Sequence, residues 1–80
     1  MTTQCREGTI RRGPFLQKLR EMDFEFKAHG ARMDTYKRTR DGQIILVRKK
    51  NCISEDYVLR TLLQHGQARE EAERFISAVR

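Results

Sequence analysis

The spacing of apolar residues changes several times along the chain, and each change predicts a different element. After Gly13-Pro14, where proline suits the first turn of a helix, apolar residues recur at helical spacing. Residues 24–27 instead alternate phenylalanine with charged residues, which predicts a half-buried strand. The helical stripe consists of Phe15, Leu16, Leu19 and Met22. A short amphipathic helix followed by a strand is therefore expected.

A second and a third strand are predicted after a turn at 29–31, where Gly30 is free to adopt positive φ. Residues 33–38 alternate without a cleanly apolar face, and Asp41-Gly42 is a strong hairpin signal. The continuous apolar run Ile44–Val47 predicts a central strand, buried on much of both faces. The pattern thus indicates three antiparallel strands.

Two helices are predicted after this sheet. Ser54 is a suitable N-cap, with acidic residues in the following turn, and Gly66 is the expected C′ residue of the same helix. A last helix carries the stripe Ala68, Ala72, Phe75, Ile76 and Val79. The expected fold is a single small α+β domain of residues 13–80, ordered α-β-β-β-α-α, with the helices on one face of the sheet. Residues 1–12 are expected to form a flexible tail.

Positive charge is concentrated in the predicted sheet. The chain of 80 residues carries a net charge of +6, and residues 24–50 hold eight Lys or Arg against three Asp or Glu, or +5. A basic surface of this kind attracts nucleic acid through counterion release. Candidate phosphate contacts are Arg38, Arg40, Lys49 and Lys50, although each is also compatible with a solvated charge. Tyr36 is placed either to stack on a base or to pack on the sheet.

Composition argues against several other kinds of protein. Two cysteines, Cys5 and Cys52, are too few for a disulfide scaffold, and they lack metal-type spacing with either histidine. No metal or other cofactor is therefore expected. No apolar run approaches the roughly 20 residues of a membrane span, and residues 1–12 do not look like a signal peptide. The reducing cytoplasm is the expected location.

The order of elements and one short motif resemble a known family. The helix–strand–strand–strand–helix layout is similar to that of double-stranded-RNA-binding domains, which read RNA by its shape. Within it, His29-Gly30, Asp34 and Tyr36 resemble the His-Gly-Gly-Asn-His-Asp-Ile-Tyr variant of the HicA (YcfA-like) toxin family. The resemblance spans about residues 14–66. It implies a small bacterial mRNA interferase, an endoribonuclease that pairs with a HicB-like antitoxin.

Carried over residue by residue, the resemblance places Met33 where the family has its catalytic histidine. Ala31 and Arg32 stand where the family has glycine and asparagine, whereas Gly30, Asp34 and Tyr36 match directly. A thioether is neither an acid nor a base near neutral pH, so the usual chemistry is not available at Met33. Met33 is equally consistent with a packing residue on a strand.

His29 is then the one candidate catalytic residue in the turn, because its unperturbed pKa suits proton transfer. It would activate a 2′-hydroxyl, with Arg32 or Lys37 stabilising the charged phosphorane, or it contacts phosphate without catalysis. His65, beside Gly66, is expected to be structural. The expected function is an RNA-binding, HicA-like toxin-family protein with impaired or lost cleavage. The alternative is a non-enzymatic nucleic-acid-binding or protein-interaction adaptor of phage or plasmid type.

Overall fold

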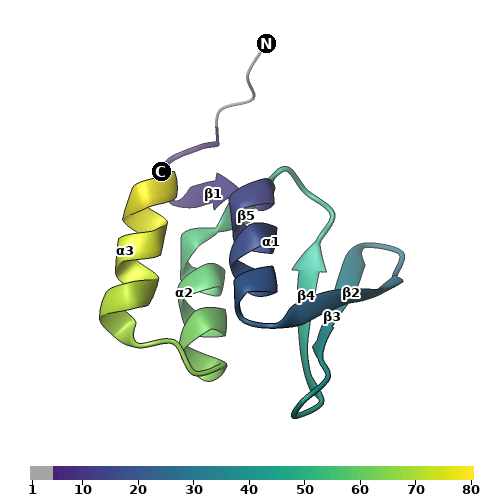
Figure 1. Cartoon of the computed structure of the whole chain (residues 1–80). Coiled ribbons are helices and arrows are strands. Elements are labelled where there is room, and N and C mark those ends of the chain that lie inside the picture. The colour runs from purple at the N-terminus through teal and green to yellow at the C-terminus, as the bar shows by residue number, and fades with distance from the viewer. Residues whose placement is uncertain (1–4) are drawn as a thin grey trace.

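The computed structural model describes residues 5–80, which form an α+β domain with a layer of helices beside a sheet (Figure 1). The elements, in chain order, are β1 (Thr9–Arg11), α1 (Arg12–Glu21), β2 (Phe24–His29), β3 (Met33–Arg38), β4 (Gln43–Arg48), β5 (Cys52–Ser54), α2 (Glu55–Gln64) and α3 (Arg69–Val79). The predicted small α+β domain with a three-stranded antiparallel sheet is confirmed.

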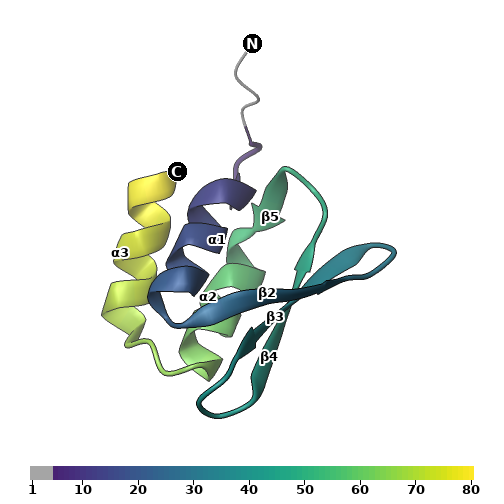
Figure 2. The same ribbon diagram turned by 45° about the vertical axis from the view of Figure 1, so that its right-hand side comes forward.

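The main sheet is antiparallel in the order β2-β3-β4, so β3 is its central strand. The helices lie on one side of it, and the β2–β3 hairpin extends beyond them (Figures 1 and 2). The prediction that Ile44–Val47 is a central strand buried on both faces is wrong. β4 is an edge strand, and Ile44 and Leu46 are 53% and 45% exposed on the face that points away from the core.

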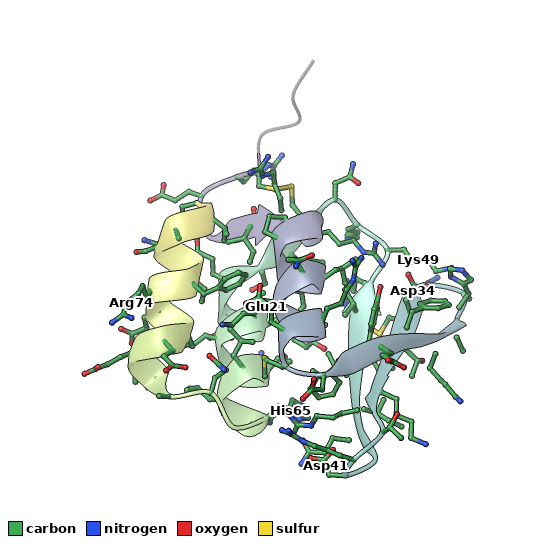
Figure 3. All side chains as sticks on the ribbon, in the orientation of Figure 1. Glu21, Asp34, Asp41, Lys49, His65 and Arg74 are labelled. Carbon is green, nitrogen blue, oxygen red and sulfur yellow. A yellow bond between two sulfur atoms is a disulfide. The ribbon has the colours of Figure 1, made fainter. Side chains whose placement is uncertain are left out.

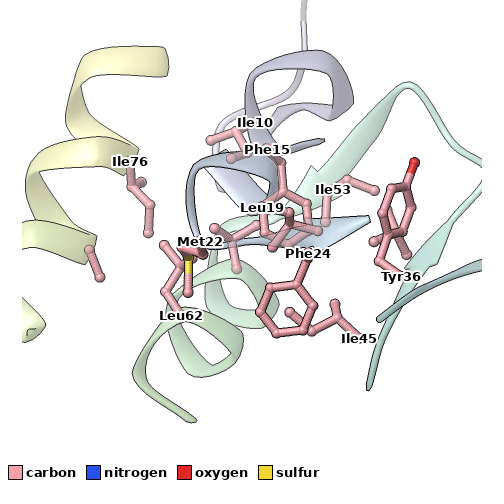
Figure 4. Packing of buried hydrophobic residues seen from close by; sticks show 13 residues of the cluster. Ile10, Phe15, Leu19, Met22, Phe24, Tyr36, Ile45, Ile53, Leu62 and Ile76 are labelled. Carbon is pink, nitrogen blue, oxygen red and sulfur yellow. The ribbon is translucent and has the colours of Figure 1, made fainter. Parts of the chain in front are cut away.

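The core lies between the sheet and helices α1 and α2, as Figure 4 shows. Phe15 and Leu19 of α1 and Val58 and Leu62 of α2 are fully buried, and Ile76 joins them from α3. Because side chains alternate along a strand, every second residue of β3 points to this core. The inward set is Asp34, Tyr36 and Arg38, each buried, and the outward set is Met33, Thr35 and Lys37, each half-buried.

The predicted N-terminal tail is wrong for residues 9–12. Thr9–Arg11 form β1, which pairs antiparallel with β5, and Arg12 begins α1. Ile10 is almost completely buried, and this apolar residue anchors a segment that otherwise reads as polar. The loop before β1 is also tied down, because Cys5 and Cys52 form a disulfide with a Cα–Cα distance of 5.5 Å. The ordered domain thus begins before Gly13, and residues 1–4 of the predicted tail lie outside the described residues.

Both predicted ends of α2 are confirmed. The Ser54 hydroxyl accepts a hydrogen bond from the Tyr57 N–H at 3.4 Å, which satisfies one of the free amides of the first turn. Gly66 follows the helix with φ of +100°, a conformation that costs glycine little. Within residues 5–80, every helix is too short or too polar to cross a membrane.

Candidate nucleic-acid interface

A β-bulge at Lys27 determines which face of the sheet His29 occupies. Phe26 pairs with Tyr36, but the register then shifts, so that Ala28 pairs with Thr35 and His29 with Asp34. In a regular strand, residues 26 and 29 would point to opposite faces. The extra residue places both on the same face, the one that also carries Asp34. The sequence pattern alone did not indicate this bulge.

Asp34 is a buried carboxylate surrounded by three basic side chains. Its Oδ1 lies 2.8 Å from His29 Nδ1 and 3.6 Å from Lys49 Nζ, and its Oδ2 accepts a hydrogen bond from Arg12 at 2.6 Å. The hydrogen bond from His29, with the charges of Lys49 and Arg12, outweighs burial and lowers the pKa of Asp34 below its usual value. The carboxylate is therefore ionised at neutral pH and orients the side chains around it. With Asn51, these residues line a shallow hollow.

Further cations lie at the same end of the sheet, on the backbone segments next to this hollow. The Lys49 N–H donates to the Arg32 carbonyl at 3.1 Å, and Arg12 Nε donates to the Arg48 carbonyl at the same distance. Figure 3 shows Asp34 and Lys49 at this end, beside the β2–β3 hairpin. The side chains of Arg32, Arg48 and Lys50 make no ion pair with any carboxylate of residues 5–80. We call Arg12, Arg32, Arg48, Lys49 and Lys50 the basic end of the sheet.

Gly30 is required in the hairpin for a reason other than the predicted one. Its φ is not positive, so the prediction of a left-handed turn residue is wrong at this position. Instead, its N–H donates to the Met33 carbonyl at 2.7 Å, and a Cβ on Gly30 would lie 2.6 Å from that same oxygen. Any side chain would therefore force this tight turn apart.

Met33 and His29 lie on opposite faces of the sheet. Met33 pairs with Arg48 on the outward side, whereas His29 pairs with Asp34 on the side of the helices. Met33 lines a second hollow, next to α2, together with Leu46, Arg48, Lys50, Tyr57 and Arg60. His29 therefore does not occupy the position that the family resemblance assigns to the catalytic histidine. This geometry therefore does not favour His29 as a replacement for the histidine that the family has at the position of Met33.

Three of the predicted contacts lie away from the basic end. Lys37 is half-buried on the outward face, opposite Glu25 and Ile44, and Arg40 pairs with Asp23 at 3.3 Å. A six-residue strand spans about 17 Å, and Lys37, Arg38 and Arg40 lie toward or beyond the far end of β3. Arg38 and Arg40 therefore lie at the opposite end of β3 and β4 from Lys49 and Lys50.

Two of the predicted contacts are buried. Arg38 donates to both carboxylate oxygens of Asp41 and to the carbonyls of Met22 and His65, and its guanidinium lies 4.8 Å from the ring centre of Phe24. These contacts within the fold are structural. Tyr36 is in the core, so of its two proposed roles the structure supports packing. Because Tyr36 points inward on β3, its ring is not available to stack on a base.

Sequence reasoning missed Arg12, which completes the Asp34 cluster. Arg12 precedes Asp34 by 22 residues and was expected in a loose tail. The hydrogen bond from the Arg12 N–H to the Asn51 carbonyl fixes the start of α1 next to the end of β4. Only this tertiary contact brings Arg12 to Asp34, and no periodic signal in the sequence indicates it.

His65 lies in a different cluster, at the other end of the sheet, and it makes stability depend on pH. Its Nδ1 bonds the Gln43 side chain, and its ring meets Phe24 edge-on at 5.2 Å. Burial, reinforced by the charge of Arg38 and only partly offset by Asp41, lowers the pKa of His65 below 6.5. The unfolded chain then binds a proton before the folded chain does as pH falls. Its contacts with Gln43 and Phe24 are those of a structural residue, which is the role expected of His65.

We therefore expect the free energy of unfolding to decrease between pH 7.5 and pH 5.5. Urea titrations at several pH values would measure this, with His65→Gln as the matched variant, because glutamine keeps a polar group but does not titrate. The slope over this window should be smaller in His65→Gln than in the wild type. Equal slopes in both proteins would contradict the assignment to His65.

Among residues 5–80, no three His, Cys, Asp or Glu side chains come close enough together to hold a metal ion. Comparison of the chain with protein-family models, with curated proteins and with solved structures found no match.

Proposed function

We propose that the protein is an RNA-binding protein of the HicA-like toxin type, in which mRNA cleavage is impaired or lost. The observation that carries this proposal is the basic end of the sheet. Arg12 and Lys49 contact its one carboxylate, Asp34, whereas Arg48 and Lys50 line the hollow beside Met33 on the other face. The five cations and Asp34 together sum to +4, with histidine counted as neutral. Counterion release from a polyanion would favour binding there. The Asp34 cluster orients Arg12, His29 and Lys49 toward one hollow, which suits a backbone phosphate.

Impaired cleavage is proposed from the position of Met33. If the family resemblance is correct, the acid–base group would project from the outward face, beside Arg48, Lys50 and Tyr57. Met33 supplies no titratable group there. The 70% exposed His29 side chain projects from the other face and is held at Nδ1 by Asp34, so we assign it to phosphate contact. The alternative is that His29 is catalytic, and experiment can distinguish this role from phosphate contact.

The proposed partner besides RNA is a HicB-like antitoxin protein in the cytoplasm. Ile44 and Leu46 present apolar side chains on the open sheet face, with Lys37 and Arg48 beside them. An acidic partner with apolar contact residues would complement this face. In a reducing compartment, the Cys5–Cys52 disulfide would be reduced, and the pairing of β1 with β5 would hold this segment in place.

The same open face favours a second candidate function, a non-enzymatic adaptor that binds another protein. Met33, Ile44 and Leu46 give this face an apolar character that RNA binding alone does not require. Such an adaptor would bind its protein partner through the sheet and would show no salt-sensitive affinity for RNA.

The experiment that tests the proposal compares the wild type with Met33→His and His29→Ala. The wild type should bind RNA without cleaving it and should not arrest bacterial growth when expressed. Met33→His restores an imidazole on the outward face and should give measurable RNA cleavage, whereas Met33→Gln, a polar control that does not titrate near neutral pH, should not. Gel electrophoresis of labelled RNA gives the readout.

Two results would count against this proposal in different ways. Cleavage by the wild type that disappears in His29→Ala would show that His29 is catalytic, and the claim of impaired cleavage would be wrong. Failure of the wild type to bind RNA at low salt would remove the RNA-binding proposal and favour the adaptor.

A further inference from the structure

Phe26 and His29 form an exposed aromatic pair on the edge strand β2. Phe26 is 48% exposed, and its ring centre lies 4.6 Å from that of His29, with the planes tilted by 54°. The buried ring of Tyr36 supports Phe26 edge-on, with the ring centres 5.7 Å apart. The Phe26 ring is thus held from one side by Tyr36 and open to solvent on the other, and it forms one aromatic surface with His29.

The exposure of Phe26 follows from the geometry of the hairpin. The bulge at Lys27 turns Phe26 and His29 to the same face, which is the face that the helices cover farther along the sheet. Near residues 26–29, however, the β2–β3 hairpin extends beyond the helices (Figure 2). The same face that buries Phe24 in the core therefore leaves Phe26 in solvent.

The aromatic pair is continuous with the Asp34 cluster. His29 belongs to both, because its ring contacts Phe26 while its Nδ1 lies 2.8 Å from Asp34. Asp34 in turn holds Arg12 and Lys49. An aromatic surface beside paired cations is the combination that binds single strands, where bases stack on rings and the backbone is held electrostatically.

We infer that Phe26, together with His29, is a stacking site for an unpaired nucleobase, and that the RNA bound at the basic end is single-stranded. This inference rests on the proposed function and specifies that the bound RNA is single-stranded and not a duplex. In a duplex, the base faces are already stacked on one another, and recognition of duplex shape needs no aromatic side chain. The role first considered for Tyr36 thus belongs to Phe26, its cross-strand neighbour.

The test measures the affinity of Phe26 variants for a short single-stranded RNA and for a duplex of the same sequence. Stacking of one base on an aromatic ring is worth about 1–3 kcal/mol by alanine substitution, so Phe26→Ala should weaken single-strand binding about tenfold. Duplex affinity should change by less than about twofold. Because no phosphate contact is removed, the slope of log affinity against log salt should stay at its wild-type value.

Phe26→Trp provides a second readout that does not depend on loss of binding. The chain contains no tryptophan, so this variant carries a single indole at the site. Its fluorescence should be quenched when single-stranded RNA binds, and its affinity should equal or exceed that of the wild type. Circular dichroism of both variants checks that the fold is retained.

Three outcomes would overturn the inference. Unchanged single-strand affinity in Phe26→Ala, or equal weakening for single strand and duplex, would exclude base stacking while leaving RNA binding intact. An unquenched indole in an RNA-bound Phe26→Trp would do the same. Absence of RNA binding by the wild type would instead remove the proposed function itself, and the stacking site with it.

Discussion

Replacing both Lys49 and Lys50 by alanine should lower the affinity for RNA about 100-fold at low salt. Lys49 lines the hollow beside Asp34 and Lys50 lines the hollow beside Met33. We expect each to make a charge-assisted hydrogen bond to phosphate, which contributes about 1.5 kcal/mol, or roughly a factor of ten. Loss of two phosphate contacts on a single strand should also reduce the salt slope by about 1.4. Fluorescence anisotropy of a labelled RNA across a salt series would measure both quantities.

The matched control removes the same charge elsewhere. Lys37→Ala with Arg40→Ala also deletes two cations, but one is half-buried at the far end of the open face and the other is paired with Asp23. We expect this variant to change RNA affinity by less than about threefold, allowing for weak screened attraction. If the two double variants lose RNA affinity equally, the affinity depends only on the net charge of the protein. The assignment of the site to the basic end would then be wrong.

Replacing Arg38 by alanine should cost about 3 kcal/mol of folding free energy, because it breaks a buried ionic cluster. The change removes the partner of Asp41 and leaves the carbonyls of Met22 and His65 without their donor. It also removes the cation that lies against the Phe24 ring. Urea unfolding monitored by circular dichroism would give the difference.

Arg40→Ala is the comparison for this stability prediction. Arg40 and Asp23 form an exposed ion pair, and such pairs contribute about 0–1 kcal/mol. If Arg38→Ala unfolds like the wild type but binds RNA more weakly, our interpretation of Arg38 as a structural residue is wrong. Arg38 would then be a phosphate contact.

Much of the fold was predictable because local signals agreed with the final contacts. The apolar stripe of α1, the alternation at Phe24 and Phe26, and the Ser54 cap each specify an element without reference to the rest of the chain. The apolar run in β4 was misread because Ile44 and Leu46 look like core residues. Their exposure depends on which sheet face the helices leave open, and periodicity does not contain that information.

The site was less predictable than the fold. Each face of β3 carries a mixture of polar and apolar side chains. The sequence therefore did not show that Asp34, Tyr36 and Arg38 point inward. The bulge at Lys27 and the approach of Arg12 both depend on tertiary pairing. The clustering of charge in residues 24–50 did indicate a basic surface, but it did not separate the two ends of the sheet.

The salt dependence of RNA binding by the wild type tests the central claim most directly. If three to five cations of the basic end contact the phosphates of a single strand, log affinity should fall linearly with log salt, with a slope of about −2 to −3.5. The measurement is a set of anisotropy titrations between low and physiological ionic strength. A slope near zero, or no binding at the lowest salt, would contradict an electrostatic RNA interface at this end of the sheet.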